Sequence, residues 1–206
     1  MIRVVFRYRP FVTIAVVSLI LASASCESDD NPCSLPTQTN NPVVVFETTL
    51  GEFAVVLYPR EVPKTVDNFL RYVNESFYDS LIFHRVIKRF VIQGGAYDDS
   101  LQKKPAHEPI PNEAENARSN TRGTLAMARN ADPHSATCQF FINHKDNPLL
   151  DFREEAPNAW GYCVFGEVIV GMDVVDRIAD VETTTRDGFQ DVPVEPVVIV
   201  RLYLSN

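Results

Sequence analysis

The chain has 206 residues, of which 45% are hydrophobic and 10% aromatic; this composition suits one domain of ordinary size and excludes an intrinsically disordered chain. Its 27 acidic residues outnumber its 19 lysines and arginines, which gives a net charge of −8. A nucleic-acid partner is not expected, because phosphate backbones require basic surfaces.

The first 25 residues have the order of an export signal. Three arginines among the first nine residues precede an apolar run, residues 11–24, that is too short to span a bilayer comfortably and ends in small side chains. We predict a signal peptide over residues 1–25 and a protein that is exported from the cytoplasm.

Two processing routes fit the end of this segment. One is ordinary cleavage at Ala22-Ser23-Ala24, and the other is lipoprotein processing just before Cys26. The stretch before Cys26 resembles the bacterial lipobox in its leucine and small residues, although Ser23 stands where that pattern has an aliphatic residue. We predict lipidation of Cys26, and a periplasmic protein or a membrane-attached lipoprotein, with free secretion as the alternative.

Residues 26–42 read as an acidic and polar linker. After Cys26, only Cys33 and Leu35 are apolar in the sixteen residues 27–42, so this stretch cannot bury enough surface to fold. As a flexible coil it would reach roughly 20–25 Å. The folded domain is therefore predicted to occupy residues 43–206.

Short β-prone runs dominate this domain. The first two, residues 43–49 and 52–58, flank Leu50-Gly51 and predict a hairpin. Further runs of the same kind follow at residues 123–129, 138–143, 162–170 and 197–204.

Two segments predict helices. Pro63 suits a first helical turn, and Val66, Phe69, Leu70 and Val73 follow it at the spacing of one helix face. In the second segment, residues 171–178, the apolar face contains Met172, Val175 and Ile178, and Asp173 lies in the first turn.

The stretch FHRVIKRFVIQGG, residues 83–95, predicts two strands joined near Lys88-Arg89. Its polar residues His84, Arg85 and Gln93 stand among aromatic and β-branched side chains. They could simply face water from half-buried strands, or they could form a site. Parity cannot decide whether Arg85 and Gln93 share a face, because the turn between them resets the alternation.

The separated motifs FHRVIKRFVIQGG, GTLAMAR, QFFIN and YCVFGEVIVGMDVVDRI resemble the cyclophilin family of peptidyl-prolyl cis-trans isomerases. The segment PIPNEAENARSNTRGTLAMAR resembles the bacterial periplasmic branch of that family. The resemblance covers the chain from Val43 to its last strand. It implies a mainly β fold, an eight-stranded closed antiparallel β-barrel capped by two α-helices.

The resemblance also implies the activity and the partners. It implies an isomerase that accelerates rotation of X-Pro bonds in exported or unfolded chains, without a cofactor or a metal. Proline-containing polypeptides are then the partners, the protein is a monomer, and membrane contact occurs only through the possible lipid anchor. The alternative is a cyclophilin-like peptide-binding or holdase module with little catalysis, which would have no need of a fixed Arg85.

Carried over position by position, the resemblance makes Arg85 the catalytic residue. The guanidinium would donate a hydrogen bond to the prolyl nitrogen once the amide is twisted, without a nucleophile or a proton transfer. The residues expected to bind substrate are Phe90, Val91, Gln93, Ala128, Arg129, Gln139, Phe141, Leu149, Leu150 and Tyr162.

Four of these residues depart from the commoner family pattern. Val91 replaces a methionine, Arg129 an asparagine, Leu149 a tryptophan and Tyr162 a histidine. The change at Leu149 bears on inhibitor binding more than on catalysis. The loop of residues 152–159 suggests no role from its sequence.

Residues of two other kinds of site are present. A hydrolase could draw on Ser135, Cys138, His84, His134 and His144 with Asp151, but no nucleophile signature surrounds these residues. A zinc site could draw on His134, Cys138, His144 and Cys163, but the paired spacing of structural zinc ligands is missing. Cys138 and Cys163 lie in apolar runs, so we expect buried thiols, with a disulfide as the alternative.

Overall fold

The structure, a computed structural model, describes residues 41–205. The predicted signal peptide, Cys26 and nearly all of the predicted linker lie outside the described residues, so these assignments stay predictions. Among residues 41–205, no helix has the length and apolar character needed to cross a bilayer.

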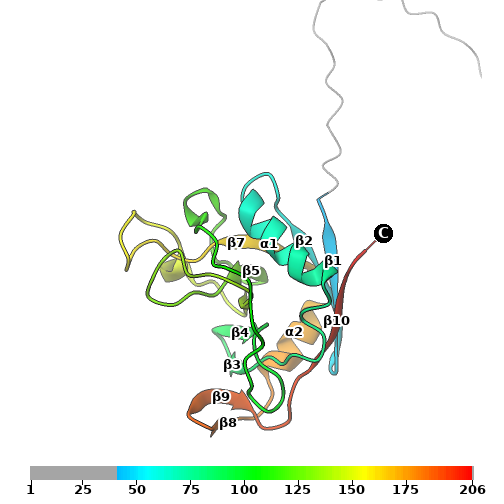
Figure 1. The fold of residues 1–206 in the computed structure, drawn as a ribbon. Coiled ribbons are helices and arrows are strands. Elements are labelled where there is room, and N and C mark those ends of the chain that lie inside the picture. Colours follow the sequence, from blue (N-terminus) through cyan, green and yellow to red (C-terminus); the bar gives the residue numbers. More distant parts are fainter. Residues whose placement is uncertain (1–40, 206) are drawn as a thin grey trace, which may run out of the picture. The chain divides into compact units, whose positions relative to one another are not determined.

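One antiparallel sheet of eight strands forms the body of the fold (Figure 1). Its strands are β1 (Val43–Thr48), β2 (Gly51–Leu57), β3 (Arg85–Ile87), β4 (Val91–Gly94), β5 (Thr124–Met127), β6 (Phe140–Asn143), β7 (Val164–Val170) and β10 (Ile199–Leu204). Their order across the sheet is β10-β1-β2-β7-β5-β6-β4-β3. The predicted hairpin around Leu50-Gly51 is confirmed as the β1–β2 pair, in which Thr48 lies opposite Gly51.

The predicted eight-stranded antiparallel sheet is confirmed, but the prediction that it closes into a barrel is slightly overstated. The edge strands β3 and β10 do not pair with each other, although residues just before them form an isolated bridge between Ile82 and Val198. The Ile199 N–H also donates to the Leu81 carbonyl at 2.7 Å. The sheet therefore curls until its ends meet without a continuous ladder, because β3 has only three residues and lies against β9.

A second sheet, of two strands, was not predicted. It consists of β8 (Thr183–Arg186) and β9 (Phe189–Pro193), joined through Asp187-Gly188, and lies beside β3 at one end of the molecule (Figure 1). Both turn residues have positive φ, 52° and 85°, as an Asp-Gly hairpin turn requires. The turn signal was present in the sequence, but β8 is polar and largely exposed, and in β9 the buried residues Val192 and Pro193 are adjacent, so neither strand shows a core-facing alternation.

Both predicted helices are confirmed, as α1 (Pro63–Asn74) and α2 (Met172–Ala179). In α1 the predicted residues Val66, Phe69 and Val73 are buried, whereas Leu70 is only partly buried. The N-terminal turn of α1 receives a carboxylate from elsewhere in the chain: the Thr65 N–H and hydroxyl each donate to Glu113 Oε2 at 2.8 Å. A negative charge at this position complements the helix dipole.

Aromatic side chains fill the space between the sheet and α1. The rings of Phe46 and Phe53 stack at 4.6 Å, and Phe140 of β6 meets Phe46 and Phe69 edge-on at 5.5 and 6.0 Å. All four residues of β6 are buried. One face of β6 therefore packs in the core through Phe140, and Phe141 is buried on the opposite face.

Candidate active site

The hairpin of β3 and β4 brings Arg85 and Gln93 together. The two residues lie directly opposite each other across the antiparallel pair, and Arg85 Nη1 donates to Gln93 Oε1 at 3.4 Å. Directly paired residues share a face of the sheet, which answers the question that the sequence pattern left open.

A polar row extends from this pair in both directions. Gln93 Nε2 donates to Gln139 Oε1 at 3.0 Å, which links β4 to the segment before β6. On the other side, Arg85 Nε lies 3.9 Å from Asp191 Oδ2 of β9. Arg85 is thus held between an amide and a carboxylate, and Asp191 is a neighbour that sequence reasoning missed because the β8–β9 hairpin was not predicted.

Beside this row lies a half-open cavity of about 270 Å³. Nine residues line it, and all nine are among the predicted catalytic and substrate-binding residues: Arg85, Phe90, Val91, Gln93, Ala128, Arg129, Phe141, Leu150 and Tyr162. The cavity is large enough for a small apolar ring and the backbone that flanks it.

The two remaining predicted residues lie next to the cavity. Gln139 lines the adjoining groove, together with Lys103, Pro109 and Thr137. Leu149 is 84% exposed and borders a separate depression near Tyr162. A substrate contact for Leu149 therefore stays a prediction.

Three side chains build one wall of the cavity. Phe141 meets the ring of Tyr162 edge-on at 5.5 Å, and the guanidinium of Arg129 lies 4.7 Å from the centre of the Tyr162 ring. Arg129 Nε donates to the Gly161 carbonyl at 2.9 Å, and Nη1 donates to the Asn130 carbonyl at the same distance. Arg129 thus holds this wall in place. The sequence pattern predicted that Arg129 binds substrate, but it did not indicate this structural role.

Asn120 also supports this wall, and the sequence analysis did not predict its role. Its buried Nδ2 donates to the Leu150 carbonyl at 3.1 Å and to the Tyr162 carbonyl at 3.3 Å. Its backbone N–H donates to Asp151 Oδ1 at 2.7 Å. An asparagine in a polar loop carries no pattern of its own, so only the folded chain identifies this contact.

His84 precedes Arg85 but faces the interior. It is buried, its ring meets Tyr97 edge-on at 4.7 Å, and its Nδ1 has no hydrogen-bond partner. Burial, with a smaller contribution from the charge of Arg85, lowers the pKa of His84 to about 4. His84 is therefore a neutral core residue near pH 7.

The side chains weighed for a hydrolase are engaged elsewhere. His144 contacts Asp176, the Ser135 hydroxyl donates to the Asp132 carbonyl at 2.6 Å, and His134 packs edge-on against Trp160. Within residues 41–205, no three His, Cys, Asp or Glu side chains gather in a way that could hold a metal ion.

Cys138 and Cys163 are buried and free, as predicted. Cys163 Sγ lies 3.4 Å from the Thr65 hydroxyl, and burial raises the pKa of Cys163 to about 12. Burial likewise raises the pKa of Cys138. Both thiols are thus held in the protonated, unreactive form.

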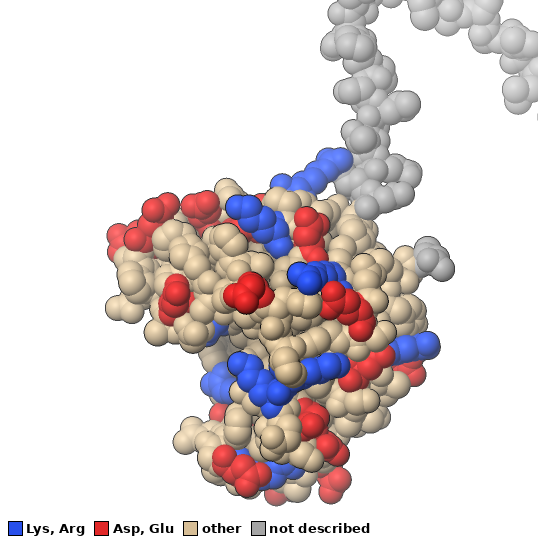
Figure 2. Space-filling view, in the orientation of Figure 1, with Lys and Arg blue, Asp and Glu red and all other residues tan. Residues whose placement is uncertain are grey.

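Charges of both signs share the surface. On the face that Figure 2 shows, basic side chains gather in a band across the middle, and acidic side chains lie above and below it. The acidic net charge therefore does not produce a surface of one sign on this face.

Comparison with known proteins places the chain in a family. The model of the family described as "Cyclophilin type peptidyl-prolyl cis-trans isomerase/CLD" matches residues 43–204. Peptidyl-prolyl cis-trans isomerase B of Escherichia coli is 51% identical over 164 residues, which are 80% of this chain and the whole of that protein. Peptidyl-prolyl cis-trans isomerase cyp18 of Streptomyces antibioticus is 53% identical over 156 residues, 76% of this chain and 94% of that protein.

A solved structure supports the fold. The crystal structure of a cyclophilin-type isomerase from Cryptosporidium parvum aligns with a TM-score of 0.68 at 23% identity, over 81% of this chain and 98% of that one. The family match over the entire described body, with two relatives at about half identity, leads to one conclusion. The chain belongs to the cyclophilin-type peptidyl-prolyl cis-trans isomerases.

Proposed function

We propose that Arg85 is the catalytic group of this isomerase and that the adjoining cavity receives the proline ring of the substrate. The observation that carries the proposal is the guanidinium of Arg85, which faces a cavity that Val91, Phe141 and Leu150 also line. Gln93 lies on one side of this guanidinium and Asp191 on the other.

The proposed mechanism follows from amide resonance. A planar X-Pro amide resists rotation with a barrier of ~18–20 kcal/mol, and the twisted amide loses resonance and leaves a lone pair on the prolyl nitrogen. A fixed guanidinium donates a hydrogen bond to that lone pair only in the twisted state, so it lowers the barrier. About 5 kcal/mol of such stabilisation corresponds to nearly four orders of magnitude in rate.

The walls of the cavity add a second contribution. A twisted amide has less charge separation than a planar one, so an apolar environment favours it. Val91 and Phe141 are buried in this wall, while Gln93 and Gln139 offer amide donors and acceptors to the backbone of an extended substrate.

The substrates that we propose are proline-containing chains outside the cytoplasm. The support is the sequence of residues 1–25, with its arginines, apolar run and small residues, followed by the acidic linker and Cys26. Cell fractionation tests this location, and recovery of the protein with the cytoplasmic fraction would contradict it.

The alternative, a holdase with little catalysis, is distinguished by comparing two activities. For the wild type and Arg85→Ala, we would measure isomerisation of a short X-Pro peptide and suppression of aggregation of an unfolded protein. The proposal expects Arg85→Ala to lose the first and to keep most of the second. A wild type that suppresses aggregation but does not accelerate peptide isomerisation would favour the holdase.

A further inference from the structure

The turn between β3 and β4 has an unfavourable backbone conformation next to the cavity. Its residue Phe90 lines the cavity, and the preceding residue, Arg89, has a positive φ of 60°. A residue with a Cβ rarely adopts this left-handed backbone conformation, which persists only where surrounding contacts hold it. The contacts that fix Arg89 therefore also decide where Phe90 lies.

One residue, His144, holds the turn at two points. The Arg89 N–H donates to His144 Nδ1 at 2.9 Å, and the His144 N–H donates to the Phe90 carbonyl at 2.9 Å. The side chain of Asn147 supplies one further donor to the Phe90 carbonyl, at 3.1 Å. His144 follows the last residue of β6, so the turn is fastened to a strand of the core.

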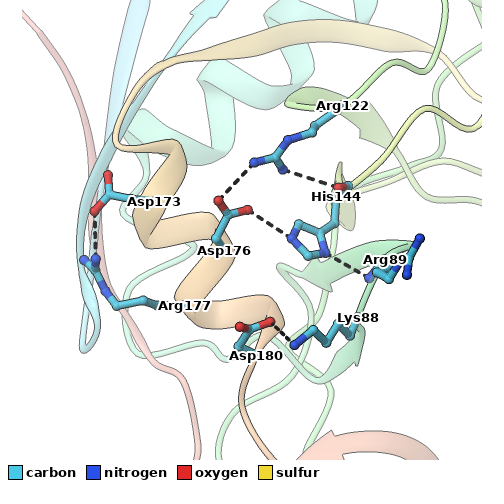
Figure 3. Close-up of polar contacts among 8 residues, drawn as sticks. All are labelled: Lys88, Arg89, Arg122, His144, Asp173, Asp176, Arg177 and Asp180. Atoms are coloured by element: carbon cyan, nitrogen blue, oxygen red, sulfur yellow. Dashed lines mark hydrogen bonds and ion pairs between the residues drawn. The ribbon is translucent and has the colours of Figure 1, made fainter.

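The other side of the His144 ring is fastened to α2 (Figure 3). His144 Nε2 lies 3.0 Å from Asp176 Oδ1, and the second oxygen of Asp176 accepts from Arg122 Nη2 at 3.0 Å. Arg122 Nη1 also donates to the His144 carbonyl at 3.3 Å. The side chain of His144 is 11% exposed, whereas those of Asp176 and Arg122 are 42% and 43% exposed, so the imidazole is shielded from water but its two partners are not.

These partners determine where the imidazole carries its proton. Nδ1 accepts a hydrogen bond from a backbone N–H, so the neutral ring has its proton on Nε2 and donates it to the Asp176 carboxylate. The Asp176 carboxylate thus orients the ring, and the ring in turn holds the Arg89 amide.

We propose that His144, oriented by Asp176, is a positioning residue that fixes Phe90 in the wall of the substrate cavity. The inference rests on the proposed function, because it gives Phe90 a substrate contact. The chain offers a matched control in Lys88, which also links the turn to α2 through Asp180, at 2.8 Å. Those two side chains are 62% and 54% exposed, so their ion pair contributes little.

The kinetic test compares His144→Ala, His144→Asn and Lys88→Ala in the unit formed by residues 39–206. We expect this unit to fold without the preceding residues, since it is compact and contains all of residues 43–204, which the family model matches. We expect His144→Ala to raise KM about fivefold and to change kcat less than about twofold, because Phe90 contacts the ring equally in the ground and twisted states. Asparagine places an oxygen near the position of Nδ1, so His144→Asn should recover most of the loss, and Lys88→Ala should match the wild type.

A structural test separates this inference from the proposed function. At pH 8, ¹⁵N NMR should show His144 with Nε2 protonated and Nδ1 unprotonated. The Arg89 amide should be protected from hydrogen exchange in the wild type and in His144→Asn, but not in His144→Ala. The opposite tautomer, an unprotected Arg89 amide in the wild type, or equal KM values in His144→Ala and wild type would overturn the inference. If Phe90→Ala has no effect on KM while the NMR results hold, the placement of substrate at Phe90 is wrong instead.

Discussion

Arg85 and Gln93 lie opposite each other on β3 and β4, and the guanidinium of Arg85 donates to the Gln93 side-chain oxygen at 3.4 Å. This contact orients a planar group with donors in a fixed fork, whereas an ammonium is a mobile and strongly hydrated point charge. Arginine at position 85 can therefore present its donors in a fixed orientation that lysine would not keep.

We expect Arg85→Ala to lower kcat/KM by roughly 100-fold or more, equivalent to about 2.7 kcal/mol, and Arg85→Lys to recover only part of that loss. A peptide isomerisation assay measures both values, with circular dichroism to verify the fold. Arg201→Ala is the control, since Arg201 pairs with Glu47 at 2.6 Å and lies on β10, away from the cavity. Turnover of a folded Arg85→Ala variant near the wild-type value would exclude the proposed role.

The second prediction concerns Asp191, the other neighbour of Arg85. The two charges are 3.9 Å apart and their side chains are 38% and 39% exposed, which places the pair among weak ion pairs, worth about 0.2–1 kcal/mol. Asparagine tolerates the positive φ of this position, 59°, and removes only the charge. We expect Asp191→Asn to lower kcat/KM by less than about fivefold; a 50-fold fall would show that the carboxylate is essential.

The third prediction compares two glycines with positive φ. A Cβ at Gly161, where φ is 70°, would lie 2.5 Å from the backbone of Asp151 and Phe152, next to the cavity wall. A Cβ at Gly188, where φ is 85°, would meet nothing within 4 Å. Gly188→Ala should therefore cost only the backbone conformation, about 1 kcal/mol.

Gly161→Ala should lower the free energy of unfolding by at least twice as much and should raise KM, because Leu150 and Tyr162 would have to move. Urea unfolding and peptide kinetics measure the two effects. If the two substitutions lowered the free energy of unfolding equally, residues 150–162 would be able to move aside and accommodate the added Cβ.

The fourth prediction is a dependence of stability on pH. The folded pKa of His84, about 4, lies below the ordinary value of 6.5, so the unfolded chain binds the proton first as the pH falls. The contribution of His84 to stability is therefore complete above pH 6.5 and is lost progressively between pH 6.5 and 4, by about 3 kcal/mol.

The measurement is urea unfolding at pH 7 and at pH 4.5 for the wild type and His84→Phe, which keeps an aromatic ring against Tyr97 but does not titrate. The wild type should lose more stability than the variant over this interval. An identical loss in both proteins would mean that His84 already binds its proton in the folded state.

The fifth prediction concerns the segment before the folded unit. If Cys26 carries the lipid, two acyl chains should hold the protein at a membrane, because one chain alone binds only marginally. Cys26→Ser should then abolish acylation and either block processing or release the protein into the soluble fraction, with isomerase activity unchanged. Cys33→Ser, in the same segment, is the matched control. A mature protein that begins at Ser25 and has no lipid in mass spectrometry would exclude anchoring.

The sequence by itself determined the features that depend on neighbours along the chain. Runs of β-branched and aromatic residues located the strands, the spacing of Val66, Phe69 and Val73 located α1, and the separated motifs indicated the family. These features were predictable because β-branched and aromatic side chains favour extended backbone, and because a helix returns to the same face about every 3.6 residues. The β8–β9 hairpin has no such pattern, because β8 contains no apolar residue and the buried residues of β9 are adjacent, so only its Asp-Gly turn indicated it.

Only the tertiary structure decided which distant side chains meet. Gln93 contacts Gln139, 46 residues away, and the Arg89 amide contacts His144, 55 residues away. Likewise, Asp191 reaches Arg85 only because the hairpin packs on β3, and Leu149 proves to lie outside the cavity. Such contacts depend on strand register, on the curl of the sheet and on the packing of loops, and these are fixed by the whole chain when it buries its core.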